Sequence, residues 1–500
     1  MKFLEYINKM LRPFSMYTGI GLGLSGIFLV ALLLSALGYF NFTPLALALS
    51  ALVLVGTTYI ASLLCGWLFG VKAYWESSII TGLILTLIFT PSADISQLVV
   101  LAFVGFIAGV SKYILTWRGR HIFNPAALAA VVICFTGLGA ASWWVATPIL
   151  TPVVALVVLI SLYQSKRYWV VGTFLAITIP VLLIEFLIFG ATFGESIWLL
   201  MSWPILFLAG IMLTEPLTLP PRRWQMYVVA AVTAVAFLLP IKIGAFQMTP
   251  ALTLLIGNIV AAVFAGRYVL TLKLKKRTQL TPSTDEFVFE TEKPFVYEPG
   301  QYMELMVPHK RADFRGIRRR FSITSQPNTK QISFGIKFYE PSSSFKRTLR
   351  TLGDGATIRA TVVAGDFVLP KDEAKQLVFV AGGIGITPFI SHLRAIKKNS
   401  RDITLVYAVG SAQELAYAQE LTAFGIDVIV VAPEKPKDLP NDWKYSQGSR
   451  INYDELAAMV PDVSERWAYI SGPTPFVQFG KKQLRKLGAR GVKTDYFAGY

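Results

Sequence analysis

The chain has 500 residues, of which 54% are hydrophobic and 15% charged, with a mean hydropathy of +0.54 and a formal net charge of +17. These values exclude a single soluble domain of average composition, and the length leaves room for two to four domains. Much of the basic charge lies in loops beside long apolar segments, where Lys and Arg fix membrane topology. We therefore expect no nucleic-acid partner.

The composition changes sharply near Leu272. Residues 1–272 form a series of long apolar segments, whereas later residues carry charges and turn formers at ordinary density. This division predicts a polytopic domain in the lipid bilayer followed by a soluble half. Cys65 and Cys134 lie in apolar segments without metal-ligand spacing, so we expect core residues and no metal site.

A helix needs roughly 20 apolar residues to cross a bilayer, and we predict about ten such helices. They lie near residues 16–39, 44–69, 77–90, 96–115, 123–140, 149–163, 169–190, 196–213, 224–240 and 249–271. The first follows a basic segment without a small-residue cleavage site, which indicates a membrane span and not a removed signal peptide.

The loop charges predict the orientation. With a cytoplasmic N-terminus, basic residues gather in the inside loops: Lys72, Arg118, Arg120, Lys166, Arg167, Arg222 and Arg223. The outside loops carry Lys242 and otherwise acids such as Asp94 and Glu195. This asymmetry predicts a multi-pass protein of the cell inner (plasma) membrane with both termini in the cytoplasm.

Three polar segments interrupt the apolar half: residues 118–127, residues 213–223, and the last span with Thr253 and Gly257-Asn258. The first two are predicted on the inside and close together in depth. Polar groups at membrane depth are costly and usually line a site. The alternative is that these residues are ordinary helix ends.

The stretches HIFNPAALA (121–129) and MLTEPLT (212–218) resemble the B subunit of the sodium-translocating NADH:quinone reductase and the D subunit of the Rnf electron-transport complex. The resemblance covers about residues 70–270. It implies a ten-helix fold that carries FMN or riboflavin. The candidate flavin contacts are His121, Asn124, Thr214 and Glu215.

In that family one FMN is joined to a threonine in an SGAT-type motif, which this sequence lacks. Its nearest counterpart is Gly190-Ala191-Thr192, predicted on the outer side. Thr192 is thus either an attachment site or an ordinary loop threonine.

The soluble half begins with short alternating strands, as in FVFETEK (287–293) and QISFGIKFYE (331–340). Strand and helix signals follow from Gln376 onward. This order predicts an antiparallel β-barrel over 273–372 and an α/β nucleotide-binding domain over 373–500.

The stretch QLVFVAGGIGITP (376–388) is the centre of that α/β domain. An apolar β-branched strand runs into Gly382, Gly383 and Gly385, and Pro388 follows where a helix would begin. Backbone amides and a helix N-terminus make a phosphate cradle. Alone, the stretch is equally compatible with a tight strand-to-helix turn.

Four earlier motifs add weight: PGQY (299–302), RRFSITS (319–325), SSFK (343–346) and GDF (365–367). With the glycine turn, they resemble the ferredoxin–NADP reductase family in type and order. The resemblance implies that Arg319 pairs with the FAD diphosphate, Phe321 stacks on the flavin and Ser322 approaches flavin N5. The expected FAD contacts are Gln301, Tyr302, Arg319, Phe321, Ser322, Ile323, Thr324, Ser343, Ser344, Phe345, Lys346 and Gly365.

The same resemblance assigns the nicotinamide dinucleotide to Gly382, Gly383, Gly385, Thr387, Pro388, Gly472 and Pro473. Ser471 replaces the family's cysteine beside the nicotinamide, and we expect it to be catalytic together with Ser322 and Tyr500. Tyr500 is expected to cover the flavin, with Phe497 as its competitor. No arginine for a 2′-phosphate follows the second strand, ITLVYA, so NADH is favoured over NADPH.

Together these observations predict an FAD-dependent NAD(P)H oxidoreductase that passes electrons into a flavin-carrying membrane domain, and on to a quinone or an extracytoplasmic acceptor. One alternative is an ion-translocating or transport protein regulated by its reductase module. Another is a haem-type ferric reductase. The chain has three histidines, and His121 alone is near a predicted span, which disfavours bis-histidine haem.

Overall fold

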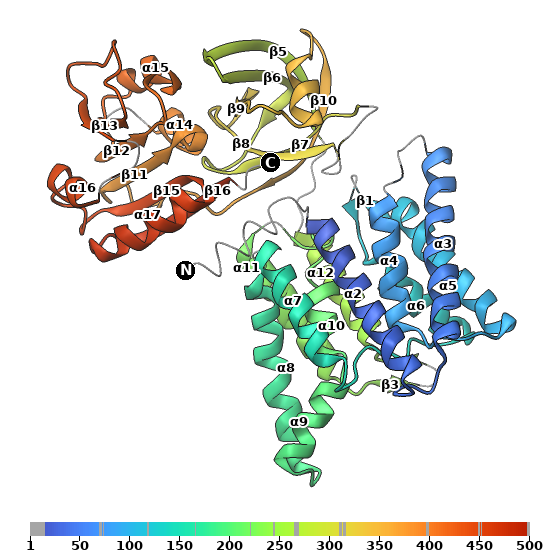
Figure 1. Ribbon diagram of the computed structural model, residues 1–500. Helices are drawn as coiled ribbons and strands as arrows, with labels where there is room; N and C mark the ends of the chain where they lie inside the picture. The colour runs from blue at the N-terminus through green and yellow to red at the C-terminus, as the bar shows by residue number, and fades with distance from the viewer. Residues whose placement is uncertain are drawn as a thin grey trace. The chain divides into compact units, whose positions relative to one another are not determined.

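The computed structural model describes residues 16–69, 73, 75–117, 120–165, 167–220, 222–243, 246–264, 270–309, 313, 317–396, 400–448, 451 and 453–497. The chain divides into two compact units, Met1–Gly266 and Arg267–Tyr500 (Figure 1). The first is helical, and the second contains two six-stranded sheets.

The first unit has a helix at each of the ten predicted positions. They are α2 (Met16–Ala36), α3 (Pro44–Leu68), α4 (Trp75–Ile88), α5 (Ile95–Ile114), α6 (Pro125–Thr136), α7 (Thr151–Ser165), α8 (Tyr168–Ile188), α9 (Phe193–Ser202) with α10 (Ile205–Phe207) and the π-helix η1 (Leu208–Met212), α11 (Arg223–Leu238) and α12 (Pro250–Phe264). In the described residues, α2, α3, α5 and α8 are long and apolar enough to cross a membrane. The other helices are shorter, so the count of ten spans remains a prediction.

The segment predicted as a span over 196–213 is bent in the structure. α9 ends at Ser202, and α10 with η1 follows at an angle of 49°. Pro204 lies at the break, and proline has no N–H to continue the backbone ladder. This pair forms either a broken span or a re-entrant loop.

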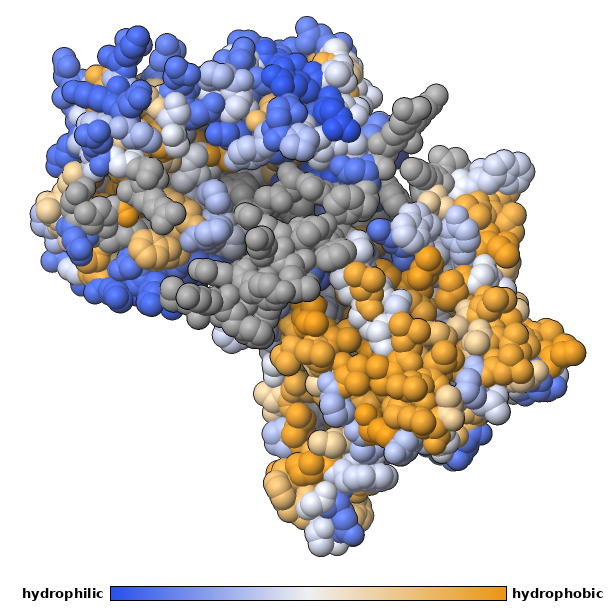
Figure 2. Space-filling model, viewed as in Figure 1, coloured by the Kyte–Doolittle hydropathy of each residue, from blue (hydrophilic) through white to orange (hydrophobic). Residues whose placement is uncertain are grey.

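Large apolar side chains are exposed along several helices of the first unit. Leu29 on α2, Leu52 on α3 and Phe189 after α8 have 62%, 72% and 81% of their surface exposed. Figure 2 shows apolar residues covering much of the visible face of this unit. Such an extent is typical of a surface that contacts lipid.

The helical unit contains an internal repeat. Pro91 and Pro216 are 125 residues apart, as are Pro125 and Pro250. A short hairpin precedes α6, formed by β1 (Thr116–Trp117) and β2 (Arg120–His121), and another precedes α12, formed by β3 (Lys242–Ile243) and β4 (Phe246–Gln247). α2 packs against α7, its counterpart in the repeat, and α6 packs against α12. The described residues of the two halves therefore repeat the order of a short hairpin followed by a helix that begins at proline.

The second unit begins with an antiparallel barrel sheet of strand order β8-β7-β10-β5-β6-β9. Its strands are β5 (Leu270–Thr281), β6 (Thr284–Phe295), β7 (Tyr302–Met306), β8 (Arg318–Ser322), β9 (Thr329–Lys337) and β10 (Thr357–Ala364), and the helix α13 (Ser344–Arg350) follows β9. Phe287, Phe289 and Phe334 fill the interior. The predicted antiparallel barrel is confirmed.

A parallel sheet of order β14-β13-β12-β11-β15-β16 follows. Its strands are β11 (Leu377–Gly382), β12 (Ile403–Ala408), β13 (Asp427–Ala432), β14 (Lys444–Gln447), β15 (Trp467–Pro473) and β16 (Arg490–Phe497), with α14 (Thr387–Ala395), α15 (Ala418–Ala423), α16 (Tyr453–Met459) and α17 (Thr474–Lys486). β11 pairs with β12 on one side and β15 on the other, so the strand order reverses there. Ligands of open α/β sheets bind at the carboxyl ends of the strands beside such a reversal.

Candidate active site at the strand order reversal

The predicted glycine turn lies at this reversal. β11 ends at Gly382, the 3₁₀ turn η2 (Gly383–Ile386) follows, and α14 begins at Thr387. The Thr387 hydroxyl donates to the Ile384 carbonyl at 3.0 Å, and Pro388 occupies the first turn of α14. The turn therefore presents the N-terminus of α14 at the sheet edge, as an anion site requires.

The glycines of the turn have different roles. Gly383 has a φ of +54°, and a Cβ built there meets nothing within 4 Å, so its backbone faces open space. A Cβ at Gly385 would lie 2.3 Å from the Ser471 carbonyl oxygen. Gly385 thus permits close packing of the turn against β15. Of the glycines predicted to contact the dinucleotide, Gly383 therefore has the open position and Gly385 the packed one.

Gly472 is a second close approach. Its φ is +154°, and a Cβ there would lie 3.0 Å from the Phe476 ring and 3.1 Å from the Gly382 carbonyl oxygen. Pro473 ends β15, and α17 begins with the next residue. The sequence SGP thus packs directly against the glycine turn.

Ser322, Ser471 and Asp495 converge between the two sheets. Ser322, at the end of β8, donates its hydroxyl to Asp495 Oδ2 at 3.4 Å. Asp495 on β16 is the register partner of Ser471 on β15. The Ser471 hydroxyl is fully buried and has no hydrogen-bond partner among the described residues. A ligand that enters here can satisfy this hydroxyl.

Burial raises the pKa of Asp495 to about 6, although the hydrogen bonds from Ser322 and the Tyr496 backbone oppose this shift. A carboxyl group with such a pKa changes its charge just below neutral pH. The sequence motifs assign no role to Asp495.

The predicted diphosphate contacts converge on a single carboxylate. Arg319 is buried, and its Nη2 lies 3.3 Å from Asp313 Oδ1. The backbone N–H of Ser344 donates to Asp313 Oδ2 at 3.0 Å. Arg319 and the Ser344 amide therefore hold one carboxylate between them, as a pair of anion-binding groups can.

Other members of the predicted set pack behind this anion position. The Phe321 and Phe345 rings stack 5.8 Å apart, and the Arg319 guanidinium lies 5.4 Å above Phe345. Phe345 is fully buried, so it supports Arg319 from below. Ser343 caps α13 by accepting the Lys346 N–H at 3.3 Å, and Lys346 Nζ donates to the Lys337 carbonyl at 2.7 Å.

Gln301 and its neighbours fix the strand that faces β8. The Gln301 amide donates to the Gly365 carbonyl at 3.5 Å, and its backbone carbonyl accepts the Ile323 N–H at 3.0 Å. Tyr302 is the register partner of Ser322. The Thr324 hydroxyl donates to Glu286 Oε1 at 3.0 Å and lies 2.8 Å from the Ser333 hydroxyl, with which it forms a second hydrogen bond. The Thr324 hydroxyl is therefore bonded to other side chains of the protein.

Tyr500 lies outside the described residues, as does the Phe497 side chain, so the expected aromatic cover of the flavin stays a prediction. Sequence reasoning assigned no role to Asp313 or Phe476. Asp313 lies in a basic stretch without a motif, and Phe476 resembles any apolar helix residue, so neither gives a signal of its own.

The polar segments of the helical unit meet one another. Asn124 caps α6, and its Nδ2 donates to Glu215 Oε2 at 2.9 Å. Its backbone N–H donates to Asn258 Oδ1 on α12 at 2.8 Å. The Thr214 hydroxyl instead donates to the Gly210 carbonyl of η1, four residues earlier, at 2.8 Å. His121 lies in β2, just before the Asn124 cap.

Thr192 is the N-cap of α9. It caps α9 in a reciprocal box, where its hydroxyl accepts the Glu195 N–H at 3.3 Å and the Glu195 carboxylate accepts from Thr192. This arrangement favours the ordinary loop threonine over an attachment site.

Comparison with known proteins identifies the class of the second unit. Residues 379–482 match the family model described as "Oxidoreductase NAD-binding domain". A flavohemoprotein from Burkholderia sp. (strain TH2) is 26% identical over 205 residues, which cover 40% of this chain and 50% of that protein. The ferredoxin reductase component of 3-ketosteroid-9-alpha-monooxygenase from Rhodococcus rhodochrous is 28% identical over 238 residues, 45% of this chain and 63% of that protein.

Among solved structures, the flavohem-like FAD/NAD binding domain of nitric oxide dioxygenase from Vibrio cholerae aligns with a TM-score of 0.40 and 22% identity, covering 46% of this chain and 98% of that one. The chain thus spans about half to two thirds of the length of these two curated relatives. The second unit is therefore similar to FAD- and NAD(P)H-dependent oxidoreductases of the ferredoxin reductase-like type.

Proposed function

We propose that the whole protein is a membrane-bound NAD(P)H oxidoreductase. It takes electrons from cytoplasmic NADH at an FAD in the second unit and passes them to FMN or riboflavin in the helical unit. A quinone or an extracytoplasmic acceptor receives them last. The helical unit spans the cell inner (plasma) membrane, and both termini lie in the cytoplasm.

The observation that carries the proposal is the meeting of Ser322, Ser471 and Asp495. Ser322 ends the segment that begins with Arg319, and Ser471 lies behind the glycine turn. A flavin bound along the first segment and a nicotinamide bound at the turn would meet at these three side chains. FAD supplies the conversion of a hydride pair into single electrons when it is bound there.

The residues present fit an FAD. Arg319 and the Ser344 amide already hold a carboxylate, so they can hold a diphosphate oxygen. The buried Ser471 hydroxyl offers a hydrogen bond to a ligand. Gly383 leaves open space beside the N-terminus of α14 for the dinucleotide phosphates.

For the helical unit, the support is the contact of Asn124, Glu215 and Asn258. These buried or partly buried polar groups lie where helices of the two repeat halves meet, since α6 belongs to the first half and α12 to the second. Polar groups at such a place usually mark a functional site in membrane proteins.

The same repeat supports one rival function, a transporter that the reductase module regulates, because repeats and broken helices such as α9 with α10 also build transport sites. A haem-type reductase is the weaker rival. His309 contacts the Val307 carbonyl and the Ser344 hydroxyl in the barrel, and His392 lies among aromatic rings in the α/β domain.

A flavin count on the purified full-length protein in detergent tests the proposal. We expect FAD together with FMN or riboflavin, more than one flavin per chain, and bleaching of both by NADH more readily than by NADPH. A single FAD with no other chromophore would favour the regulated transporter. A Soret band that shifts on reduction would contradict the proposal.

A further inference from the structure

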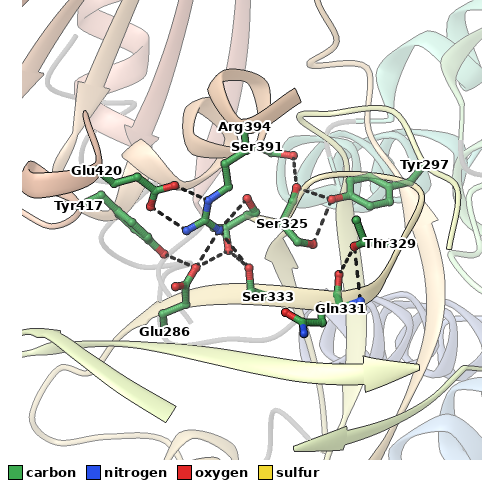
Figure 3. Close-up of polar contacts among 11 residues, drawn as sticks. Glu286, Tyr297, Ser325, Thr329, Gln331, Ser333, Ser391, Arg394, Tyr417 and Glu420 are labelled. Carbon is green, nitrogen blue, oxygen red and sulfur yellow. Dashed lines mark hydrogen bonds and ion pairs between the residues drawn. The ribbon is translucent and has the colours of Figure 1, made fainter. Parts of the chain in front are cut away.

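A polar network joins the barrel to the α/β domain at the C-terminal end of α14, and Arg394 lies at its centre (Figure 3). Arg394 donates through Nε and Nη2 to the two carboxylate oxygens of Glu420, at 2.6 and 2.7 Å. Through Nη1 it reaches the barrel, at 3.0 Å from Glu286 Oε1, 3.0 Å from the Thr324 carbonyl and 3.1 Å from the Ser333 hydroxyl. One guanidinium thus bonds to both domains at once.

Glu286 on β6 receives these bonds on the barrel side. Its Oε1 accepts from Arg394, from the Thr324 hydroxyl at 3.0 Å and from the Tyr417 hydroxyl at 3.3 Å. The side chains of Glu286 and Arg394 are 12% and 20% exposed, so solvent screens their attraction little. Figure 3 shows the Arg394 guanidinium between the Glu286 and Glu420 carboxylates.

A close steric contact supports the same junction. A Cβ at Gly335 on β9 would lie 2.5 Å from the Tyr417 hydroxyl and 2.8 Å from Thr387 Cγ2. Thr387 is the first residue of α14, so the helix touches the barrel at its start and bonds to it through Arg394 near its end. Tyr417 has a φ of +63°, a conformation that costs a tyrosine free energy and that the surrounding contacts maintain.

The network lies close in sequence to both predicted binding sites. On the barrel side it lies two residues from Ser322, and on the other side the helix α14 connects it to the glycine turn. Thr324 follows Ser322 by two residues, and its N–H donates to the Ser333 carbonyl at 2.8 Å. α14 carries the glycine turn at its N-terminus. The position of α14 against the Ser322–Thr324 segment therefore sets the distance between the nicotinamide and flavin sites.

We propose that Arg394, together with Glu286, is a positioning residue for hydride transfer: it fixes the phosphate-binding helix against the flavin-binding segment. The inference rests on the proposed reduction of FAD by NADH. Transfer between two bound groups falls steeply when their separation changes by about 1 Å. Loss of Arg394 would also leave two partly buried carboxylates facing each other, which drives the domains apart.

Two kinds of variant test the proposal in the full-length protein. Arg394→Gln removes the charge bridge, and Arg394→Lys restores the charge without the planar fork of donors. Gly335→Ala keeps every charge and places a methyl group between β9 and α14. The readouts are FAD content, the dissociation constant of NADH, and the limiting rate of flavin reduction in rapid mixing with NADH and with its C4-deuterated form.

Arg466→Gln is the matched control. Arg466 is another buried arginine of the same domain, 2.7 Å from Asp402 and 2.7 Å from Asp462. It lies at the amino ends of β11 and β15, where its Nη1 also donates to the Leu377 carbonyl. If the arginines only stabilise this domain, both substitutions should lower the limiting rate of flavin reduction. If Arg394 positions the helix, only its substitution should lower that rate.

We expect Arg394→Gln and Gly335→Ala to keep FAD but to lower the limiting rate about tenfold or more, with a larger deuterium isotope effect and a smaller change in NADH affinity. Arg394→Lys should recover part of the rate, and Arg466→Gln should keep the parent rate in its folded fraction. Limiting rates within twofold of the parent in Arg394→Gln and Gly335→Ala would overturn the proposal.

If Arg394→Gln and Gly335→Ala fail to fold, Tyr417→Phe decides, because it removes a single hydroxyl from Glu286. A measurable fall in the limiting rate supports positioning, and an unchanged rate contradicts it. If NADH does not reduce the parent flavin at all, the proposed function fails. If the parent is reduced and every variant is equally fast, the positioning role alone fails.

Discussion

The Ser322 hydroxyl and the Asp495 carboxylate lie 3.4 Å apart, and this contact joins the flavin-motif strand of the barrel to the last strand of the nucleotide-binding sheet. Asp495 is partly buried and pairs in register with Ser471. The proposed position of the flavin ring edge is therefore beside the Asp495 carboxyl group and the Ser322 and Ser471 hydroxyls.

Asp495→Asn should remove a pH dependence of flavin reduction. Burial raises the pKa of Asp495 to about 6, so the parent carboxyl is neutral below that pH and ionised above it. Reduction adds negative charge to the flavin, which an adjacent carboxylate opposes, so we expect the limiting rate to rise as pH falls through about 6. Stopped-flow reduction across pH 5–8 measures this, and an unchanged profile in Asp495→Asn would contradict the assignment.

The same group predicts a stability difference in the cofactor-free protein. Because its pKa is raised on folding, the folded state binds more protons than the unfolded state between about pH 4 and pH 6. Stability should therefore decrease as pH rises through this window, by about 2–3 kcal/mol for this group. Denaturant unfolding of flavin-depleted protein at pH 4.5 and 7, in parent and Asp495→Asn, measures it. Equal pH slopes in the two would contradict the shift.

Gly385→Ala and Gly383→Ala should fail in different ways. A methyl group at Gly385 meets the Ser471 carbonyl oxygen at 2.3 Å, so we expect loss of folded α/β domain. At Gly383 the methyl group meets open space, and the φ of +54° costs about 1–2 kcal/mol. That variant should fold and bind FAD but require more NADH. Thermal unfolding and NADH titration separate the two outcomes, and normal NADH affinity in Gly383→Ala would remove the turn from the dinucleotide site.

This difference shows what the sequence could and could not predict. The order of short motifs predicted the barrel, the α/β domain and the turn, because strand period and glycine spacing are local properties. Which glycine faces a ligand depends on Ser471, 86 residues away. Glu286 and Arg394 are 108 residues apart, and no local pattern marks either residue as part of an interdomain bridge.

In the described part of the helical unit, apolar runs located the long helices, whereas the break at Pro204 and the contact of Asn124 with Asn258 depend on packing between distant segments. The sequence did predict that the segments of Asn124 and Glu215 lie on the same side of the membrane and at a similar depth. Whether they contact flavin stays a prediction.

Asp313→Asn should strengthen FAD binding, and Arg319→Ala should abolish it. Asp313 places a carboxylate between Arg319 and the Ser344 amide, so a diphosphate must displace a like charge to enter. Arg319→Ala removes a charge-assisted bond worth about 1.5–3 kcal/mol. FAD titration of flavin-depleted protein by fluorescence quenching measures both effects. Full FAD occupancy in Arg319→Ala, or weaker binding in Asp313→Asn, would contradict the diphosphate assignment.

Glu215→Gln tests the flavin of the helical unit without disturbing its packing. The Glu215 carboxylate accepts a hydrogen bond from Asn124 at 2.9 Å, and a glutamine oxygen can accept the same bond. The variant therefore keeps the contact between the two polar segments and loses one charge beside the proposed flavin. We expect unchanged FAD and unchanged rapid reduction by NADH, but less FMN or riboflavin per chain or slower reduction of it.

Thr192→Val is the control: it removes the α9 cap, which costs about 0.5–2 kcal/mol, and leaves the flavin count intact if Thr192 holds no flavin. Flavin release from the parent by acid, which frees non-covalent flavin, completes the comparison. A second flavin that remains at parent level and parent rate in Glu215→Gln would show that Asn124 and Glu215 pack helices and do not contact a redox group.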